Sequence, residues 1–284
     1  MSETKRVILV VLAHPDDETF GMGGTLALYA KEGVEVDLVC ATRGEVGDVP
    51  DGMLDGYASV GELREHELME ATQILGITHV DFLGYRDSGM PGSVDNAHPQ
   101  ALAAAPLDEV AGKVVQYIRK YKPQIVLTFD PIGGYHHPDH IAIQRATEKA
   151  FYEAGNASFF PGDYPVYSPA KLYFHTMPKG LLRFGLFLMK LMGRDPHKFG
   201  RNGDIDLAAI AEVSFPVNAV VSYLPVAELR EKAAACHASQ GGKQNTGGSI
   251  IAQIRRIFSS KDTFMRAYPA PTKHVEKDLF ENVE

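Results

Sequence analysis

Residues 7–18 read VILVVLAHPDDE, and this stretch decides the fold. Residues 7–12 are all valine, isoleucine or leucine, a continuous apolar run that favours a β-strand buried on both faces. A polar string from His14 to Glu18 follows, and residues 22–32 then have helical periodicity. A buried strand, a polar loop and a helix in this order predict the first half of a βαβ unit.

The same alternation continues to residue 154. Short apolar runs at residues 34–40, 79–83 and 124–129 alternate with helical patterns at residues 60–75, 107–121 and 138–154. Gly33, Gly76 and Pro123 follow three of the predicted helices, where helix ends are expected. We therefore predict an α/β fold, a Rossmann-like and mostly parallel sheet with helices on both faces.

Residues 155–272 have a less regular pattern. The sequence there predicts strands near residues 172–176 and 217–222, a helix at 225–237 and a mobile loop at 241–249. The last residues, 273–284, are expected to be a solvated tail. A chain of 284 residues with this pattern is expected to form a single domain, residues 1–284.

Composition excludes several classes of protein. The chain has 28 Lys plus Arg against 36 Asp plus Glu and no long basic run, so nucleic acid is not an expected partner. Cys40 and Cys236 are far apart, which argues against a thiolate zinc site and against a disulfide framework. The apolar runs at residues 7–13 and 180–193 are too short for a membrane span, which needs about 20 residues. We expect a cytoplasmic protein that binds a small molecule.

Two strings rich in histidine and carboxylate follow predicted strands. The first is His14-Pro15-Asp16-Asp17-Glu18, and its simplest interpretation is a turn whose carboxylates cap the next helix. The second, at residues 136–140, reads HHPDH, and it also resembles a helix start with proline at the first position. Three imidazoles within five residues, however, are costly to place together without a metal, a ligand or a carboxylate to satisfy them.

Taken together, the two strings indicate a metal site. Ligands bind beyond the carboxyl ends of the strands in open α/β sheets, so both strings should lie on one rim. Histidine and carboxylate side chains from two loops suit a site with three protein ligands and an open position, which is typical of catalytic zinc. The same ligands also admit Fe²⁺, Mn²⁺ or Co²⁺.

Longer motifs then identify a family. The strings AHPDDE at residues 13–18, TRGEVG at 42–47 and HPDH at 137–140 resemble the signatures of the PIG-L or LmbE-like zinc N-deacetylases, and the resemblance covers residues 7–140 well. Further matches are Arg64 with Glu67, RDSGM at residues 86–90, and Ala235-x-His237-x-Ser239-Gln240. A site with three protein ligands and an open position is expected to hold one zinc ion per chain.

The resemblance also assigns roles to individual residues. It implies that His14, Asp17 and His140 bind zinc, that Asp16 is the general base and that His137 stabilises the tetrahedral intermediate. Zinc chemistry agrees, since a carboxylate that does not bind the metal can accept a proton from the attacking water. Asp139 is expected to orient His137, and Tyr135 to reach the acyl oxygen.

Three more residues are candidates for substrate binding. By resemblance to glucosaminide deacetylases, Arg64 and Asp87 would hold sugar hydroxyls, although a surface ion pair between them is an equal alternative. Glu45 is similar to a rim residue of the family, with a structural role as the alternative. We therefore predict N-deacetylation of an aminosugar, such as an N-acetylglucosamine conjugate, with amide cleavage of a thiol conjugate of the same scaffold as the alternative.

Two further features of the sequence allow other interpretations. A Rossmann-type nucleotide-binding protein is disfavoured because Leu26 occupies the position of the third glycine in the G-x-G-x-x-G motif. The apolar segment at residues 180–193 is interpreted as an oligomer contact or a lid over the substrate, with a buried core helix as the common alternative. A homo-oligomer is therefore possible.

Overall fold

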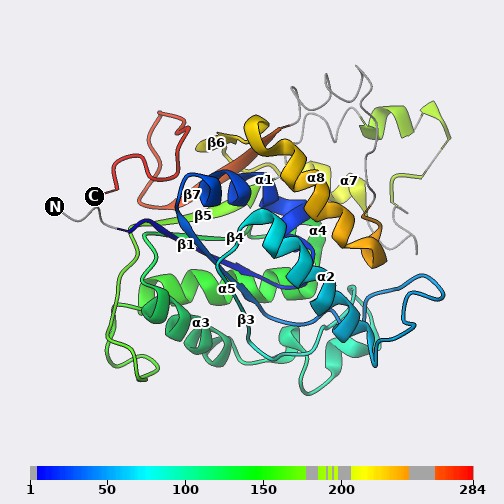
Figure 1. Ribbon diagram of the computed structural model, residues 1–284, viewed down its shortest axis with the longest axis horizontal. Coiled ribbons are helices and arrows are strands. Elements are labelled where there is room, and N and C mark those ends of the chain that lie inside the picture. The colour runs from blue at the N-terminus through cyan, green and yellow to red at the C-terminus, as the bar shows by residue number, and fades with distance from the viewer. Residues whose placement is uncertain are drawn as a thin grey trace.

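The computed structural model describes residues 5–176, 185–189, 191–193, 195–197, 206–242 and 260–283. Within these residues, seven strands form one sheet in the order β3-β2-β1-β4-β5-β7-β6 (Figure 1). In chain order the strands are β1 (Val7–Leu12), β2 (Glu35–Cys40), β3 (His79–Phe82), β4 (Ile125–Phe129), β5 (Lys171–Thr176), β6 (Ala219–Ser222) and β7 (Lys261–Tyr268).

The sheet is mostly parallel, as predicted. Strands β1 to β5 pair in parallel, whereas β7 runs antiparallel to both β5 and β6. The predicted bounds of the first four strands agree with the observed ones to within one residue at each end. Strand β7 has no counterpart among the predicted elements.

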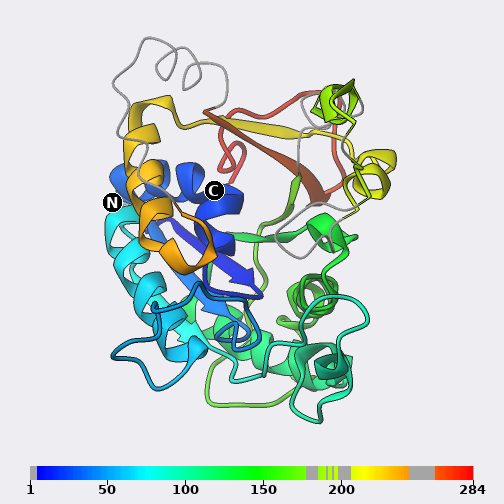
Figure 2. The same ribbon diagram turned by 90° about the vertical axis from the view of Figure 1, so that its right-hand side faces the viewer.

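Helices cover both faces of the sheet, which confirms the predicted layers. On one face α1 (Asp17–Lys31), α2 (Val60–Leu75) and α8 (Ala227–Cys236) pack together, and on the other α3 (Leu107–Tyr121) packs against α5 (Pro138–Glu153) (Figure 2). The shorter helices are α4 (Gly133–His136), α7 (Leu207–Glu212) and the 3₁₀ turns η1 (Val94–Ala97), η2 (Leu102–Ala104), η3 (Leu224–Val226) and η4 (Ala238–Gln240). None of the helices in the described part of the chain combines the length and apolarity needed to cross a membrane.

Strand β1 lies at the centre of the core. Every one of its six residues is buried, because helices cover both of its sides. The chain passes outward from β1 to β2 and β3 and then returns to β4 on the other side of β1. The loops that follow β1 and β4 therefore diverge at a topological switch point, where open α/β sheets bind their ligands.

Four predicted segments are corrected or left open. The C-terminal tail is not solvated throughout, because Glu276, Leu279 and Phe280 are buried. Helix α1 begins five residues earlier than expected and has a kink at Met22. Much of the apolar segment at residues 180–193 and of the predicted loop at residues 241–249 lies outside the described residues.

The described part of the apolar segment is exposed. Phe187, Leu191 and Met192 are all more than half exposed, so at these positions the segment is not a buried core helix. The oligomer contact and the lid stay predictions.

Candidate metal centre and active site

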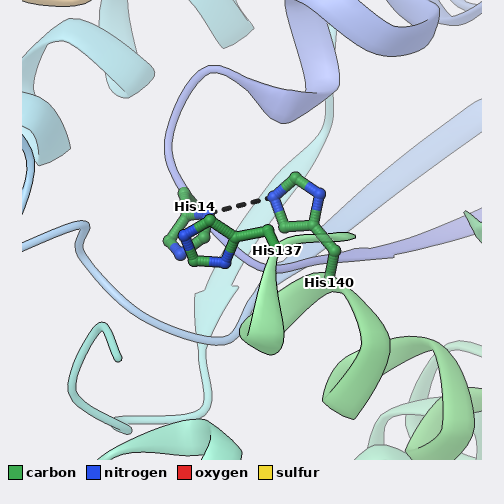
Figure 3. A group of neighbouring side chains, drawn as sticks. All are labelled: His14, His137 and His140. Atoms are coloured by element: carbon green, nitrogen blue, oxygen red, sulfur yellow. Dashed lines mark hydrogen bonds between the residues drawn. The ribbon is translucent and has the colours of Figure 1, made fainter. Parts of the chain in front are cut away.

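The two polar strings of the sequence meet at the switch point. His14 follows β1, while His137 and His140 lie at the start of α5, which follows β4 through the short helix α4. Because β1 and β4 are neighbours in the sheet, their loops converge, and the three imidazole rings lie together (Figure 3). All three side chains are buried.

The side chains of three residues have the mutual spacing of zinc ligands. His14 Nδ1 lies 3.2 Å from His140 Nε2 and 3.5 Å from Asp17 Oδ2, and the other Asp17 oxygen, Oδ1, lies 3.3 Å from His140 Nε2. Zinc bonds of about 2.0–2.2 Å at tetrahedral angles separate their ligand atoms by about 3.3–3.6 Å. The nitrogen and oxygen donors of these residues therefore fit a zinc ion without rearrangement of the chain.

The charge around His14 also fits a cation. Its Nε2 lies 3.1 Å from Asp139 Oδ2 and 3.5 Å from Asp87 Oδ1. Burial alone would lower the pKa of His14, but Asp87, Asp139 and Asp17 together raise it well above the usual value. A proton on His14 thus offsets part of the acidic charge, and a bound divalent ion would replace that proton.

The other two donors are in the protonation states that a metal requires. Burial would raise the pKa of Asp17, but His140 and His14 hold it below its usual range. Burial lowers the pKa of His140 to about 4, against the opposite effect of Asp17. A carboxylate and a neutral imidazole result, and both are ready to bind metal.

Other sets of side chains lie close enough to share an ion. His14 forms one such set with His137 and His140 and another with Asp87 and Asp139, the donor atoms of each set lying within 4.8 Å of one another. A separate set, Glu35, Asp37 and His79, lies at the opposite edge of the sheet, where β2 and β3 begin. His14 is common to all the sets at the rim.

Asp16 precedes Asp17 in the chain and has an unusual backbone conformation. Its φ of 114° and ψ of −28° are strained for a residue other than glycine, at a cost of about 1–3 kcal/mol. Burial raises the pKa of Asp16 to about 7, while the Arg64 guanidinium, 3.2 Å away, lowers it. The pKa of Asp16 therefore lies close to neutral pH.

Arg64 is a buried residue, and the alternative of a surface ion pair with Asp87 is wrong. Only 4% of its surface is exposed, and its guanidinium donates to the carbonyl oxygens of Gly44 at 3.0 Å and Pro15 at 2.7 Å. Gly44 has a φ of +67°, and a Cβ there would meet Arg64 Nη1 at 2.1 Å. The glycine of the TRGEVG string thus makes room for the guanidinium.

The prediction that Asp139 orients His137 is wrong. Its carboxylate accepts from His14 Nε2 at 3.1 Å and from the amide and hydroxyl of Ser88, and the described contacts include no bond from it to the ring of His137. Instead, His137 caps α5, accepting the amide of Asp139 on Nδ1 at 3.2 Å. Asp139 therefore orients His14, because its side chain projects from the first turn of α5 toward the β1 loop.

Tyr135 and the remaining predicted site residues surround this centre. The ring of Tyr135 lies with its centroid 5.0 Å from that of His140 and 5.8 Å from that of His137. Asp87 is buried and accepts from the amides of Gly89 and Val46. Glu45 accepts the amide of Asp87 at 3.0 Å, so the loops after β2 and β3 are joined beside His14.

Two residues in the site were not among the predicted ones. Glu18 Oε1 and His237 Nε2 lie 2.7 Å apart, both side chains are fully buried, and the other oxygen of Glu18 accepts the amide of Asp16. His237 belongs to the matched C-terminal motif, but 219 residues separate it from Glu18, and no local pattern could identify this partner.

Comparisons with known proteins place the chain in a family. A family model described as PIG-L, GlcNAc-PI de-N-acetylase, matches residues 9–151. A protein of Streptomyces avermitilis, named 1D-myo-inositol 2-acetamido-2-deoxy-alpha-D-glucopyranoside deacetylase, is 36% identical over 98% of this chain and 97% of its own. The chain belongs to the PIG-L family. A deacetylase of the same name from Thermomonospora curvata is 40% identical over 72% of this chain and 71% of its own.

Solved structures agree with this PIG-L fold. The N,N'-diacetylchitobiose deacetylase of Pyrococcus horikoshii has a TM-score of 0.60 at 23% identity, with 92% of this chain and 83% of that chain covered. The 4-carboxy-2-hydroxymuconate hydratase of Pseudomonas putida has a TM-score of 0.61 at 20% identity, with 95% and 99% covered. At these identities the likeness concerns the fold alone, and the deacetylase activity of this PIG-L protein rests on the family and its relatives.

Proposed function

We propose that this PIG-L protein is a zinc-dependent hydrolase that removes the acetyl group from N-acetylglucosamine linked to a polyol such as myo-inositol. The observation that carries the proposal is the 3.2–3.5 Å spacing of the donor atoms of His14, Asp17 and His140 beside Asp16. The names of the relatives from Streptomyces avermitilis and Thermomonospora curvata supply the substrate class.

His14, Asp17 and His140 hold the zinc ion in this proposal. When bound, zinc lowers the pKa of a water molecule and polarises the acyl oxygen. Asp139 fixes the ring of His14 by accepting from Nε2 at 3.1 Å, so that Nδ1 faces the other two donors.

Asp16 is the general base that accepts a proton from the attacking water. Its pKa of about 7 suits a group that must take up and release a proton near neutral pH. Arg64 donates to its Oδ2 at 3.2 Å and therefore limits the directions that the carboxylate can take.

His137 donates a hydrogen bond to the oxygen on which negative charge develops. Burial, His14 and His140 lower its pKa to about 3, so the ring is neutral. Its Nδ1 accepts the amide of Asp139, which leaves the ring proton on Nε2. The ring thus supplies one donor of fixed direction, and the hydroxyl of Tyr135, whose ring lies next to that of His137, supplies a second donor.

Asp87 and Glu45 contact sugar hydroxyls in this proposal. Both carboxylates lie on loops at the rim, next to His14. Arg64 already donates to three oxygen atoms of the chain, which supports a role in positioning Asp16, and its contact with the sugar stays a prediction.

Amine release from the inositol glycoside tests the function. The zinc-loaded chain is expected to release free amine from 1D-myo-inositol 2-acetamido-2-deoxy-α-D-glucopyranoside, and Asp16→Asn is the matched control that should not. The same assay with N-acetylglucosamine and with a thiol conjugate of the glucosaminide separates the alternative. Turnover of the thiol conjugate alone would reject the deacetylase in favour of the amidase, and no turnover of any aminosugar would reject both.

A further inference from the structure

The backbone of Asp16 needs external support to keep its strained conformation. Its φ of 114° is rare for a residue with a side chain, and such conformations persist only where neighbouring contacts over-determine them. The direction of the Asp16 carboxylate therefore depends on the groups that hold the residue.

Two side chains hold Asp16 at different atoms. Arg64 donates to its Oδ2 and to the carbonyl oxygen of Pro15. The backbone amide of Asp16 in turn donates to Glu18 Oε2 at 2.9 Å. Glu18 lies in the first turn of α1 and has no exposed surface.

His237 in turn holds Glu18. Its Nε2 lies 2.7 Å from Glu18 Oε1, and neither side chain is exposed. A carboxylate removed from water is costly unless it is paired and hydrogen-bonded, and His237 supplies that partner. Burial would lower the pKa of His237, but Glu18 raises it above the usual value, which favours the charged form of the ring.

We propose that His237 and Glu18 are positioning residues of the catalytic base. His237 orients the carboxylate of Glu18, and Glu18 fixes the amide of Asp16 and thereby the direction of its carboxylate. The proposal rests on the proposed function of Asp16 as the base. In the described part of the chain, neither side chain hydrogen-bonds the side chains of the three proposed zinc ligands, so the pair acts on the base and not on the metal.

Ser239 provides a matched structural control. It lies in the same segment, is equally buried, and donates from its amide and hydroxyl to Glu67 at 2.8 and 2.6 Å. These bonds attach the segment to α2 and have no contact with Asp16 among the described residues. Loss of the Ser239 hydroxyl therefore measures what a purely structural bond in this segment contributes.

A double-mutant cycle tests the proposal on turnover of the inositol glycoside by the zinc-loaded enzyme. Glu18→Gln should lower kcat by about 10- to 100-fold, because a misdirected reacting group costs that much, with KM and bound zinc unchanged. In the Asp16→Asn background it should cause no further loss, since it acts only through Asp16. Equal losses in both backgrounds would overturn the proposal.

Three further variants separate positioning from stability. His237→Leu should lower kcat as Glu18→Gln does, whereas His237→Gln, which keeps an N–H donor, should recover part of the loss. Ser239→Ala should lower Tm and leave kcat within about threefold of the unaltered enzyme, the scale of a bond remote from the chemistry. A loss of kcat in Ser239→Ala as large as in His237→Leu would identify a structural role for the whole segment.

Hydrogen exchange at the Asp16 amide gives a readout that needs no turnover. In NMR of the zinc-loaded protein, Glu18→Gln and His237→Leu should each accelerate this exchange by about tenfold or more, with β1 amides unchanged. Unchanged exchange would overturn the proposal. If the unaltered protein cleaves no aminosugar, the proposed function fails, while the exchange rates still decide whether the pair holds Asp16.

Discussion

At the scale of single residues, Asp16 and Asp17 are neighbours with opposite electrostatic surroundings. Burial raises the pKa of Asp16 to about 7, whereas His140 and His14 hold that of Asp17 below its usual range. The left-handed backbone of Asp16 turns the two carboxylates to different partners, Arg64 for one and the imidazoles for the other. Adjacent carboxylates with separated pKa values are suited to separate roles.

Exchange of each carboxylate for its amide tests this division. Asp16→Asn should keep the metal and lose about 10²- to 10⁴-fold in kcat, the usual contribution of a general base. Asp17→Asn should lose metal, because an uncharged amide is a poor zinc ligand. Metal content and kcat are measured on both purified variants, and an exchange of the two phenotypes would refute the assigned roles.

The affinity for zinc should depend on pH in a defined direction. In the metal-free chain the pKa of His14 is raised well above its usual value, so zinc must displace a proton to bind. The affinity should therefore rise as pH rises, by about tenfold per unit for one displaced proton, until the pKa of His14 is passed. Chelator competition at pH 6 and pH 7 measures the slope, and an affinity that is equal at both values would contradict the expectation.

At the scale of elements, continuous apolar runs and helix periodicity predicted most of the long elements in the first half of the chain, although the start of α1 was placed five residues too late. The bounds of β1, α2 and α3 were predicted to the residue, because each element has one clear period and a defined stop. Strand β7 was missed because its buried residues include Asp262 and Arg266, which mask the apolar pattern of a strand.

The buried tail was missed for a related reason. Glu276 looks like a solvent-exposed residue in the sequence, but it accepts from Lys171 at 2.8 Å and from Arg266 at 2.6 Å in the interior. These partners lie on β5 and β7, so only the folded sheet brings them together. A local pattern does not contain such contacts.

Asp37 in β2 offers a prediction about stability. It has no exposed surface, its Oδ2 has no hydrogen-bond partner among the described residues, and burial raises its pKa to about 6 while His79 lowers it. Because the pKa is raised in the folded state, this residue favours folding below about pH 4, and the contribution is lost as pH rises through about 6. Asp37→Asn should therefore be more stable than the unaltered chain at pH 8, by roughly 1–3 kcal/mol.

Urea unfolding at pH 4 and pH 8 measures this effect. The advantage of Asp37→Asn should shrink at pH 4, where the unaltered carboxyl is protonated in the folded state and about half protonated in the unfolded state. Asp55→Asn, at an exposed loop position, is the matched control and should unfold as the unaltered chain does at both values. A variant Asp37→Asn that is less stable at pH 8 would show that the charge of Asp37 stabilises the fold.

At the scale of the whole molecule, the site forms because the sheet order places four loops at one rim. The sequence predicted that these loops would meet at one rim, since the strand-to-helix connections could be counted. It did not predict the partners of Asp139 or Glu18, because these bonds join segments that become neighbours only in the folded sheet. The burial of Arg64 was missed for the same reason.

Substrate selectivity tests the proposed role of this assembled rim. Asp87→Ala should reduce kcat/KM for the glucosaminide far more than for a small N-acetyl amine, because only the sugar offers hydroxyls to that carboxylate. Arg64→Ala should reduce kcat on both substrates, since its donors hold Asp16 and Pro15, and an additional loss on the glucosaminide alone would measure its predicted contact with the sugar. Parallel losses for Asp87→Ala on both substrates would reject the sugar contact.

The most direct test of the central claim is a crystal structure of the zinc-loaded protein with diffraction recorded at the zinc absorption edge. One anomalous peak is predicted per chain, about 2.0–2.2 Å from His14 Nδ1, His140 Nε2 and an Asp17 oxygen, with Asp16 outside bonding distance. A peak bound by Asp87 and Asp139, a peak bound by His137, or a peak at the Glu35, Asp37 and His79 cluster alone would contradict the assignment.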